Sequence, residues 1–541
     1  MNRINSNTHL PRKLYTAEQV RTLDALLIEQ IPISALKLMR RAASVVLSVI
    51  SQRWPQLRRL VIFAGTGSNG GDGYFIAALA AAEGIKVQVL ECGELDRLRG
   101  DAASARVEAL ANGVSCKQCD ILLDLASAQF GQETVLVDAI LGTGHSGPLR
   151  GAYEPIIDWI NGSGLPIVSV DIPSGLNCDT GHVAEVAVCA TMTVCLVALK
   201  QGLFTSNGPE QAGEIVFHDL GMPEALKASD VALSTSSTRI DINYVSSMLK
   251  PRRLDAHKGD CGNVLVLGGD VGYGGAALMA AEAAARIGAG TVGLVTRSPH
   301  VTASLARRPE IMVRAIEEPD GFGSEQLLAL MQKASVLVVG PGLGNSNWSY
   351  SLLRQALEFA GSHLPVILDA DALNFLAETA AQNEDALSKE GKAMRMYSPQ
   401  WVLTPHPGEA ARLLQSTVAA VQEDRFSAAR NLQAKFGGAV LLKGAGSLLC
   451  CPGEIVDFAP EPARVEVCTE GNPGMASGGM GDVLSGMLGG LIAQGLSVSD
   501  ALRCGVCIHG EAADLAVVSE GERGLLATDL FHHIRRLANN L

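Results

Sequence analysis

The first half of this chain is organised around the stretch Gly65-Thr-Gly-Ser-Asn-Gly-Gly-Asp-Gly73. The apolar run Leu60–Phe63 leads into it, and the residues after it, Tyr74–Ala82, have the composition of a helix. A strand-to-helix turn with few side chains lets backbone amides approach an anion, and the helix N-terminus adds positive potential. The stretch is equally compatible with a simple tight turn, because it has neither the spaced glycines of a dinucleotide fold nor the lysine of a P-loop.

Outward from this turn, short β-branched runs alternate with Ala- and Leu-rich helical stretches. Such alternation is typical of a mostly parallel sheet covered by helices on both faces. A first helix is expected to begin at Thr16, which has Gln19 at capping-box spacing. The strands expected in the first half are Leu60–Phe63, Lys86–Leu90, Val135–Val137, Ile167–Val170 and Met192–Val197.

A second alternating series follows a polar segment of little periodicity between about residues 222 and 249. The strands expected there are Asn263–Leu267, Thr291–Thr296, Val336–Val339, Val366–Leu368, Val402–Leu403 and Ala439–Leu442. The pattern predicts two α/β domains, residues 10–225 and 241–541, joined by a linker at 226–240.

The bulk composition agrees with two folded domains and narrows the function. A chain of 541 residues exceeds one ordinary core, and 47% hydrophobic with 18% charged residues is a globular profile. The net charge of −13 argues against nucleic acid as a partner. The first ten residues lack the apolar core of a signal peptide, and no run approaches the roughly 18 apolar residues of a membrane span. We therefore expect a cytoplasmic protein that binds neither nucleic acid nor a membrane. We also predict a homo-oligomer, although composition does not reveal the oligomeric state.

Among the twelve cysteines, two pairs have the CxxC spacing that is found in metal and redox sites: Cys116/Cys119 and Cys504/Cys507. His509 lies close to the second pair in sequence, so a metal site is conceivable there. Neither pair follows a strand as a thioredoxin-like motif would, and a chain this long is not a disulfide scaffold. We interpret both pairs as ordinary reduced thiols.

Three expected strands of the first domain end in polar, glycine-containing turns: Gly65–Gly73, Val137–Pro148 and Val170–Gly175. Ligands of open parallel sheets bind at such carboxyl ends. An acid inside a phosphate-binding loop should repel phosphate, and a bound cation would remove this conflict. Oxygens of Asn69, Asp138 and Ser174 would be suitable ligands.

These turns resemble the NAD(P)H-hydrate epimerases over about residues 10–225, in Ser68–Gly73, Asp138, Gly142–Pro148 and Asp171–Gly175. The resemblance implies a Rossmann-like three-layer α/β/α domain that interconverts the R and S epimers of hydrated NADH and NADPH. It implies K⁺ bound by Asn69, Asp138 and Ser174. The residues it implies for the hydrated nucleotide are Ser68, Asn69, Gly70, Gly71, Asp72, Gly142, Thr143, Gly144, His145, Ser146, Gly147, Pro148 and Asp171. The family commonly has asparagine at the position of Ser68, a departure that keeps the ligand Asn69.

The chemistry of epimerisation calls for a carboxylate. The hydroxylated carbon is next to the ring nitrogen, so reversible loss of the hydroxyl gives a planar cation that can be recaptured on either face. A carboxylate can stabilise that cation and shuttle the proton. We predict Asp171 as the catalytic residue; an Asp that only caps the turn before Pro173 is the alternative. Lys200 either assists or snorkels to the surface.

In the second half, the run Glu470–Gly490 is a glycine-rich loop that enters an apolar helix with Asp482 in its first turn. Backbone amides there can hold phosphate, and Asp482 can face the group that receives a phosphoryl. As a simple N-terminal capping acid it would need no function. Further small-residue or polar turns follow other expected strands, at Gly340–Gly344, Leu368–Asn374, Thr404–Glu409 and Leu442–Ser447.

This set resembles the ribokinase-like superfamily. Within it, His257–Gly259, Gly268–Asp270, Gly274–Ala277 and Thr404–Glu409 resemble the ADP-dependent NAD(P)H-hydrate dehydratases over about residues 240–541. The resemblance implies a ribokinase-like α/β/α domain that uses ADP as co-substrate with Mg²⁺. The residues it implies for the hydrate are Ala276, Gly342, His406 and Asp482. The residues it implies for ADP are Lys443, Gly444, Ala445, Gly446, Ser447 and Gly481.

Dehydration by a kinase scaffold is chemically sensible, because hydroxide is a poor leaving group and phosphate a good one. Asp482 is predicted to be the catalytic base that activates the hydroxyl for phosphoryl transfer. An epimerase and an S-specific dehydratase together would recover all damaged NADH and NADPH. The alternative is an ATP-dependent kinase of a small hydroxylated metabolite with an N-terminal regulatory nucleotide-binding module; a non-catalytic nucleotide sensor is the third possibility.

Overall fold

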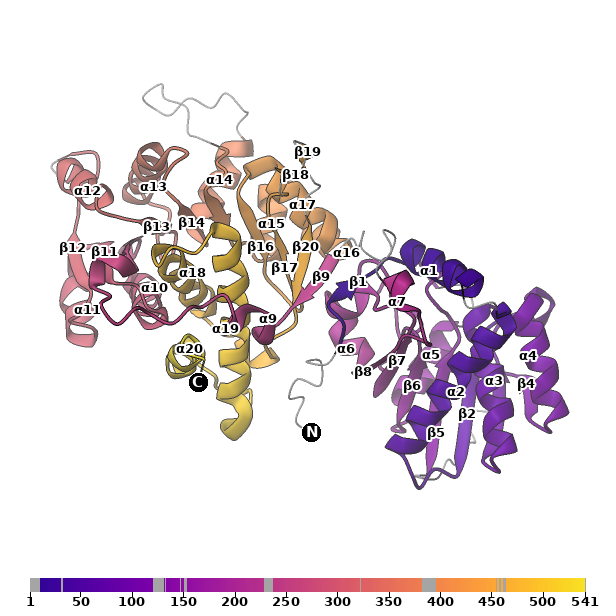
Figure 1. Ribbon diagram of the computed structural model, residues 1–541. Helices are drawn as coiled ribbons and strands as arrows, with labels where there is room; N and C mark the ends of the chain where they lie inside the picture. The colour runs from indigo at the N-terminus through magenta and orange to yellow at the C-terminus, as the bar shows by residue number, and fades with distance from the viewer. Residues whose placement is uncertain are drawn as a thin grey trace. The chain divides into compact units, whose positions relative to one another are not determined.

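The computed structural model describes residues 10–30, 33–119, 131, 133–145, 147–149, 153–227, 237–321, 323–381, 396–453, 455–456, 459–460 and 464–540. The described residues form two compact units, one ending at Thr238 and the other beginning at Arg239. Figure 1 shows a helix-covered sheet in each unit.

The first unit alternates strands and helices along its whole length. Its elements are β1 (Lys13–Leu14), α1 (Ala17–Gln30), α2 (Ala35–Arg53), β2 (Arg59–Ala64), α3 (Ser68–Ala82), β3 (Lys86–Glu91), η2 (Leu95–Arg97), α4 (Gly100–Ala111), β4 (Ser115–Gln118), β5 (Thr134–Ala139), α5 (Tyr153–Gly162), β6 (Ile167–Val170), β7 (Met192–Leu196), η4 (Gln201–Phe204), α6 (Gly208–Ala212), β8 (Glu214–His218) and α7 (Glu224–Lys227).

Its seven-stranded sheet has the order β4-β3-β2-β5-β6-β7-β8, and all neighbouring strands are parallel. The chain moves outward from β2 to β4 and then returns to the other side of β2 with β5. The crevice at the carboxyl ends of β2 and β5 is therefore the switch point where such sheets bind ligands.

Alternation along β2 supplies the core on both faces of this sheet. Leu60 and Ile62 belong to the cluster that contains apolar residues of α1, α2, α3 and α4, whereas Val61 and Phe63 belong to the cluster of α5. Successive side chains of a strand point to opposite faces, so an uninterrupted apolar run requires helices on both sides. The three-layer α/β/α prediction for this domain is confirmed.

The second unit contains the remaining elements. They are β9 (Ser237–Ile240, which begins in the first unit), α9 (Ile242–Ser246), η5 (Lys258–Cys261), β10 (Asn263–Leu267), α10 (Gly274–Ile287), β11 (Thr291–Thr296), η6 (Ser298–His300), α11 (Val301–Arg307), β12 (Met312–Ala315), α12 (Ser324–Met331), β13 (Val336–Val339), α13 (Asn347–Ala360), β14 (Val366–Leu368), α14 (Asp371–Ala381), β15 (Trp401–Leu403), α15 (Pro407–Leu413), α16 (Val418–Glu423), α17 (Arg425–Phe436), β16 (Ala439–Leu442), β17 (Ser447–Cys450), β18 (Ile455–Val456), β19 (Ala459–Pro460), β20 (Val465–Cys468), η7 (Pro473–Met475), α18 (Met480–Ala493), α19 (Val498–Glu520), η8 (Ala527–Asp529) and α20 (Leu530–Leu537).

The sheet of the second unit runs in the order β9-β20-β17-β16-β15-β14-β13-β10-β11-β12. The strands from β12 to β16 are parallel, whereas β17 pairs antiparallel with β16 and β20. The chain order again reverses between β10 and β13, which places a second switch point at their carboxyl ends. The α/β/α prediction for this domain is also confirmed: α10, α18, α19 and α20 share one core with Val264 and Val266 of β10.

All eleven expected strands form, with shifts of one or two residues at some ends. The expected helix at Thr16 is confirmed as well, because the amide of Thr16 donates to Gln19 Oε1 at 2.9 Å and the amide of Gln19 donates to Thr16 Oγ1 at 3.4 Å. Of the predicted linker 226–240, residues 237–240 form β9 and residues 228–236 lie outside the described part of the chain.

Candidate active sites

In the first domain, the glycine-rich turn is shorter than expected, because α3 begins at Ser68 rather than near Tyr74. A Cβ on Gly70 would lie 1.9 Å from the carbonyl oxygen of Gly65, and one on Gly65 would lie 1.9 Å from that of Ile140. Strand, turn and helix therefore touch through their backbones, which only glycine allows. The exposed Ser68 and the half-buried Asp72 belong to the first turns of α3, with Gly71 between them.

Asn69, Asp138 and Ser174, the three predicted K⁺ ligands, lie together and are buried. Asn69 Nδ2 donates to the carbonyl of Leu141 at 2.8 Å, and Ser174 Oγ accepts from the amide of Leu141 at 2.8 Å. Ser174 Oγ also donates to Asp138 Oδ1 at 2.5 Å. The buried oxygen Asn69 Oδ1 has no hydrogen-bond partner among the described residues.

Asp138 is an unusual carboxylate, because none of its surface is exposed at the end of β5. Its Oδ2 accepts from the hydroxyl of Ser169 at 2.8 Å and from the amide of Ser174 at 2.9 Å. Burial raises the pKa of Asp138, and these hydrogen bonds offset only part of that effect. A cation beside the carboxylate would stabilise its charged form.

The second predicted substrate loop follows β5. A Cβ on Gly142 would lie 3.2 Å from Cβ of Asn69, so this loop adjoins the start of α3. The amide of His145 donates to the carbonyl of Gly142 at 3.1 Å, which closes a turn through Thr143 and Gly144. Gly147 and Pro148 continue the loop, in which Gly147 has φ of +84°. Ser146 lies outside the described residues.

Asp171, the predicted epimerase acid, follows β6 with φ of +68°, a left-handed conformation that is uncommon for a residue with a side chain. Its Oδ1 accepts from the amide of Leu196 at 3.0 Å and from the ammonium of Lys200. Lys200 is fully buried, so it does not snorkel to the surface. Burial acts to lower the pKa of Lys200, but the carboxylate of Asp171 outweighs it and holds the pKa above its ordinary value.

Two further acids lie in the electrostatic field of this pair. Burial raises the pKa of Asp24 to about 6; Lys200 opposes this effect and Asp171 adds to it. Burial also raises the pKa of Asp72, and the charges of Asp171 and Asp24 raise it further. Asp24 was not predicted, because a single acid on an amphipathic helix reads as a solvated residue. Only the fold brings α1 to the ends of the strands.

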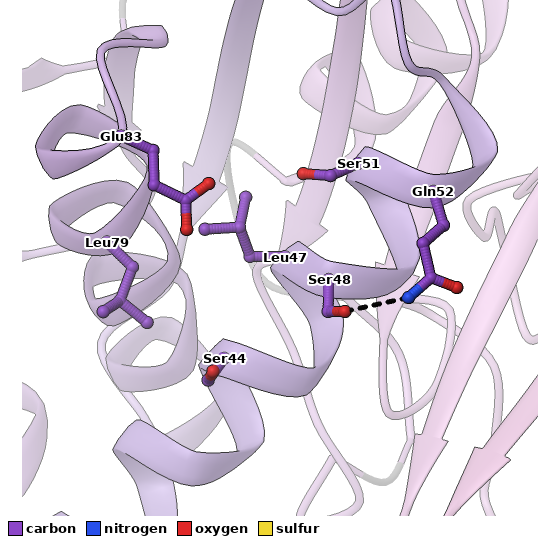
Figure 2. Close-up of a pocket in the computed structure, with 7 residues that line it drawn as sticks. All are labelled: Ser44, Leu47, Ser48, Ser51, Gln52, Leu79 and Glu83. Atoms are coloured by element: carbon purple, nitrogen blue, oxygen red, sulfur yellow. Dashed lines mark hydrogen bonds between the residues drawn. The ribbon is translucent and has the colours of Figure 1, made fainter.

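A pocket of about 460 Å³ in the first domain lies elsewhere. Figure 2 shows it between α2 and α3, with Leu79 and Glu83 at the C-terminal end of α3. The glycine turn is at the opposite end of the same helix. This pocket is therefore not part of the predicted site.

In the second domain, Asp482 lies in the first turn of α18, as predicted. Burial raises the pKa of Asp482 to about 7; Asp369 and Asp371 add to the increase, and Lys443 opposes it. A carboxylate with this pKa can take a proton near neutral pH, which is what a general base requires.

The predicted ADP loop follows β16. The amide of Lys443 donates to the carbonyl of Pro405 at 2.9 Å, which joins this loop to the end of β15. Gly444 and Gly446 have φ of +143° and +60°, and Ser447 Oγ donates to the carbonyl of Gly444 at 3.1 Å across Ala445. The loop thus exposes backbone rather than side chains, which suits a phosphate group.

A buried arginine, Arg425, supports this loop and was missed by the sequence analysis. Its Nη2 donates to the carbonyls of Leu442 and Lys443 at 3.2 and 3.3 Å. A Cβ on Gly444 would lie 2.7 Å from Arg425 Nη1. No motif marks an arginine that begins a helix and turns back onto a strand end.

The predicted hydrate ligand His406 is the N-cap of α15. Its Nδ1 accepts from the amide of Gly408 at 2.9 Å, so the neutral ring carries its proton on Nε2. Glu409 completes a capping box by accepting the amide of His406 at 2.8 Å. Burial lowers the pKa of His406, and it raises the pKa of Glu409 to about 7. Nδ1 of His406 is therefore structural, and Nε2, which lies 3.4 Å from Glu409 Oε1, is the ring nitrogen that could face a ligand.

Ala276 and Gly342, the other two predicted hydrate residues, meet at the switch point of this sheet. A Cβ on Gly342, which has φ of +58°, would lie 3.1 Å from Cβ of Ala276. Beside them is a pocket of about 660 Å³. It is lined by Tyr273, Gly344, Asn345, Asp371, Asn374, Phe375, Ala377, Glu378, Ala381 and Arg412. Gly481, which the sequence analysis grouped with ADP, lies next to Lys443, because a Cβ there would be 3.2 Å from Lys443 Nζ.

The group of possible metal ligands in the second domain differs from the one that the CxxC spacing suggested. In the described part of the chain, the three side chains whose ligand atoms gather within 4.8 Å are Cys468, Glu470 and Cys507. Cys504 and His509 are not in this group. The conceivable metal site of Cys504, Cys507 and His509 therefore does not form.

None of the helices that the structure describes combines the length and apolarity needed to cross a bilayer. Residues 35–202 match the family described as YjeF-related protein N-terminus, and residues 264–536 match the family described as NAD(P)H-hydrate dehydratase.

Full-length relatives extend these matches over both domains. The bifunctional NAD(P)H-hydrate repair enzyme of Coxiella burnetii is 43% identical and covers 97% of this chain and 99% of its own length. The corresponding enzyme of Escherichia coli is 37% identical and covers 98% and 95%. A crystal structure of the ADP/ATP-dependent NAD(P)H-hydrate dehydratase of Bacillus subtilis, co-crystallised with ATP/Mg²⁺, is 24% identical with a TM-score of 0.44 over 56% of this chain and 98% of that one.

The alternative of a metabolite kinase with a regulatory module is not favoured, because these relatives share both domains in the same order. The chain belongs to the family of bifunctional NAD(P)H-hydrate repair enzymes, with an epimerase domain followed by a dehydratase domain.

Proposed function

We propose that residues 10–225 interconvert the R and S hydrates of NADH and NADPH, and that residues 241–541 dehydrate the S hydrate with ADP, releasing AMP and phosphate. One observation carries this assignment in both domains. In each domain, a turn with few side chains lies near the carboxyl ends of strands where the chain order reverses. It is beside acids in the field of a lysine, Lys200 in the first domain and Lys443 in the second. The turn suits a diphosphate and the acid suits a reacting ring.

In the epimerase domain, Ser68–Asp72 and Gly142–Pro148 would hold the hydrated nucleotide beside Asp171. Both donors that the described residues bring to Asp171, the Leu196 amide and the Lys200 ammonium, bind Oδ1. Oδ2 therefore remains to face the ring. A proton delivered to the hydroxyl lets it leave as water, and breaking its bond to the ring carbon leaves a cation next to nitrogen, which the carboxylate stabilises. Water then adds to either face and gives up a proton, so the carboxylate would shuttle one proton in and out.

Potassium fits the buried set of Asn69, Asp138 and Ser174. Asn69 Oδ1 has no protein partner among the described residues, and the carboxylate of Asp138 is desolvated, so a cation would satisfy both. The cation would supply positive charge near the diphosphate of the substrate. The three residues join the end of β5 to the start of α3, and their own role is to hold the glycine turn in place.

In the dehydratase domain, Lys443–Ser447 and Gly481 would hold ADP. Ala276, Gly342, His406 Nε2 and Asp482 would hold the hydrate, with the pocket next to Gly342 as the space available for it. Asp482 would take the proton of the ring hydroxyl as its oxygen attacks the terminal phosphoryl of ADP, and AMP departs. The lone pair of the ring nitrogen then expels phosphate, and loss of a proton from the adjacent ring carbon restores the dihydropyridine.

Magnesium would offset charge on the phosphates of ADP and prefers oxygen ligands. The carboxylate of Glu409 fits this cation. The side chain is buried, and burial raises its pKa to about 7 because the charged form is poorly solvated; a bound cation would stabilise that charged form. A cytoplasmic location and a homo-oligomeric assembly remain predictions from the sequence.

The decisive experiment supplies purified protein with a mixture of R and S NADH hydrates, ADP, Mg²⁺ and K⁺. We expect full recovery of the absorbance of NADH with one AMP and one phosphate per NADH formed. Accumulation of a stable phosphorylated product would instead indicate a kinase, and no consumption of hydrate would refute both activities.

A further inference from the structure

Asp369 is a buried acid that the predicted site does not use. It lies between β14 and α14 with 1% of its surface exposed. A Cβ on Gly340 would lie 1.8 Å from the carbonyl oxygen of Asp369, and the next residue, Ala370, has φ of +47°. A turn that combines a close backbone approach with a left-handed alanine is held in an unfavourable conformation by its surroundings.

The carboxylate of Asp369 has two partners from distant parts of the chain. Oδ1 accepts from the ammonium of Lys443 at 2.9 Å, and Oδ2 accepts from the hydroxyl of Ser485 at 2.6 Å. Ser485 Oγ also lies 2.9 Å from the carbonyl of Gly481, one turn earlier in α18. Asp369 thereby links the predicted ADP loop to the first turn of the helix that carries Asp482.

These groups converge at Gly481. A Cβ there would be 3.2 Å from Lys443 Nζ and 3.4 Å from Asp369 Oδ2. Lys443 thus lies in the field of three carboxylates, Asp369, Glu409 and Asp482, and the direct contact is with Asp369. An ammonium with a fixed partner keeps one position, whereas one without it would turn to the next available anion.

We propose that Asp369 is a positioning residue of the dehydratase site: it holds Lys443 and, through Ser485, the start of α18, so that Lys443 meets the nucleotide and Asp482 meets the hydrate in a fixed relation. This inference rests on the proposed function of the second domain. It assigns no contact between Asp369 and either substrate.

Electrostatics supports the proposal. Burial alone would raise the pKa of Asp369, but Lys443 and the hydroxyls of Ser485 and Thr404 outweigh it and hold the pKa below its ordinary value. The charged groups that face Asp482 are Asp369, Asp371 and Lys443, and the charge of Asp369 raises the pKa of Asp482. Without that charge, and with Lys443 released toward it, Asp482 would become a weaker base.

The test is Asp369→Asn in the full chain, which preserves the shape of the side chain but not its charge. We expect kcat for the S hydrate to fall about tenfold or more, since a charge-assisted contact is lost, while KM for the hydrate stays near that of the wild type. The acidic limb of the kcat profile should shift to lower pH by about one unit. A purely structural role would not move this limb. Unchanged kcat and an unmoved limb would overturn the proposal.

Ser485→Ala is the matched second variant, because it cuts only the link to α18 and leaves the ion pair with Lys443 intact. We expect kcat to fall about threefold, as for one neutral hydrogen-bond donor, with the acidic limb unmoved. If Asp369→Asn does not fold, an unchanged kcat in Ser485→Ala overturns the proposal.

A readout without substrate separates this inference from the proposed function. After reductive ¹³C-methylation of lysines, the NMR signal of Lys443, identified by its loss in Lys443→Arg, should titrate with a pKa lower by about one unit or more in Asp369→Asn. A wild-type chain that leaves the hydrate unchanged refutes the proposed function. If the pKa of Lys443 is the same in Asp369→Asn as in the wild type, Asp369 is not a positioning residue for Lys443.

Discussion

At the residue scale, the acids of both sites differ in how closely a lysine neutralises them. Asp171 is in direct contact with the fully buried Lys200, and Asp369 is in direct contact with Lys443, whose side chain is 22% exposed. Asp482 lies in the field of Lys443 without a contact to it, and burial raises its pKa to about 7. The paired acids are suited to holding a charge in place, and the unpaired one is suited to accepting a proton.

This difference predicts the pH dependence of dehydration. A general base must be deprotonated, so kcat/KM for the S hydrate should rise with pH up to about 7 and then level off, with about a tenfold loss per unit below that value. The measurement is initial rate against pH at limiting hydrate and saturating ADP. A rate that is flat from pH 5 to 8 would contradict the role of Asp482.

Asp482→Asn tests the same residue by substitution. Because the amide cannot accept the hydroxyl proton, turnover should fall by about a thousandfold or more while ADP still binds within about threefold of wild type. Calorimetry with ADP measures the binding. Glu325→Gln, at an exposed position of α12, is the control and should behave as wild type.

Asp171→Asn should abolish epimerisation and also weaken the first domain. Lys200 is fully buried and would lose its carboxylate, which we expect to lower the free energy of unfolding by about 3 kcal/mol. Chiral separation of the hydrates follows epimerisation, and thermal unfolding follows stability. Asp158→Asn, an exposed position of α5, should change neither. Wild-type epimerisation in Asp171→Asn would remove this residue from the mechanism.

At the scale of elements, the start of α3 is positioned by backbone contacts rather than by side chains. Gly70→Ala would place a methyl group 1.9 Å from the carbonyl oxygen of Gly65, so α3 must move away from β2. We expect at least a hundredfold loss of epimerase activity, because the predicted ligands Asn69 and Asp72 move with the helix.

Gly67→Ala is the matched control for that substitution. Gly67 lies three residues earlier in the same turn, has φ of −94°, and a Cβ there would meet nothing within 4 Å. Its epimerase activity should stay within about threefold of wild type. Equal activity in both alanine variants would show that close packing at this turn is unimportant.

The elements also show what pattern reasoning can recover. Strands such as β10 and β13 were predicted with correct bounds, because a buried parallel strand is a continuous apolar run. Strands β4 and β8 lie at the two edges of their sheet and were not predicted. β4 is largely polar, and the apolar run of β8, Ile215–Phe217, is only three residues long. The antiparallel pair β17 and β20 was also missed, because the order of strands in a sheet is not encoded in any one of them.

At the scale of the whole molecule, the two activities should be separable within one chain. In Asp171→Asn, dehydration should proceed at the wild-type rate on the S hydrate, whereas the R hydrate should persist. An R/S mixture would then yield NADH equal to its S fraction, measured by absorbance and chromatography of the remainder. Complete recovery of the mixture would show that another group epimerises the substrate.

Replacement of potassium by tetramethylammonium tests the buried site around Asn69 without relying on activity. If K⁺ binds the folded first domain, its unfolding temperature should rise with K⁺ concentration, and the second domain should serve as the internal control. The rise should vanish in Asn69→Ala, which lacks the unpaired amide oxygen. Identical melting curves in the two cations would argue against the site.

The sequence by itself determined the fold class, both domains and the positions of the polar turns, because apolar periodicity and glycine placement are local properties of the chain. It also singled out Asp171 and Asp482 as candidate catalytic residues, because each lies next to a recognisable motif; their roles stay predictions. Only the tertiary structure assembled Asp24 with Lys200, and Asp369 with Lys443 and Ser485. These residues are far apart in the sequence, and their pKa values and positions depend on burial and on contacts with one another. Burial and those contacts arise only when the chain has folded and the strands lie side by side.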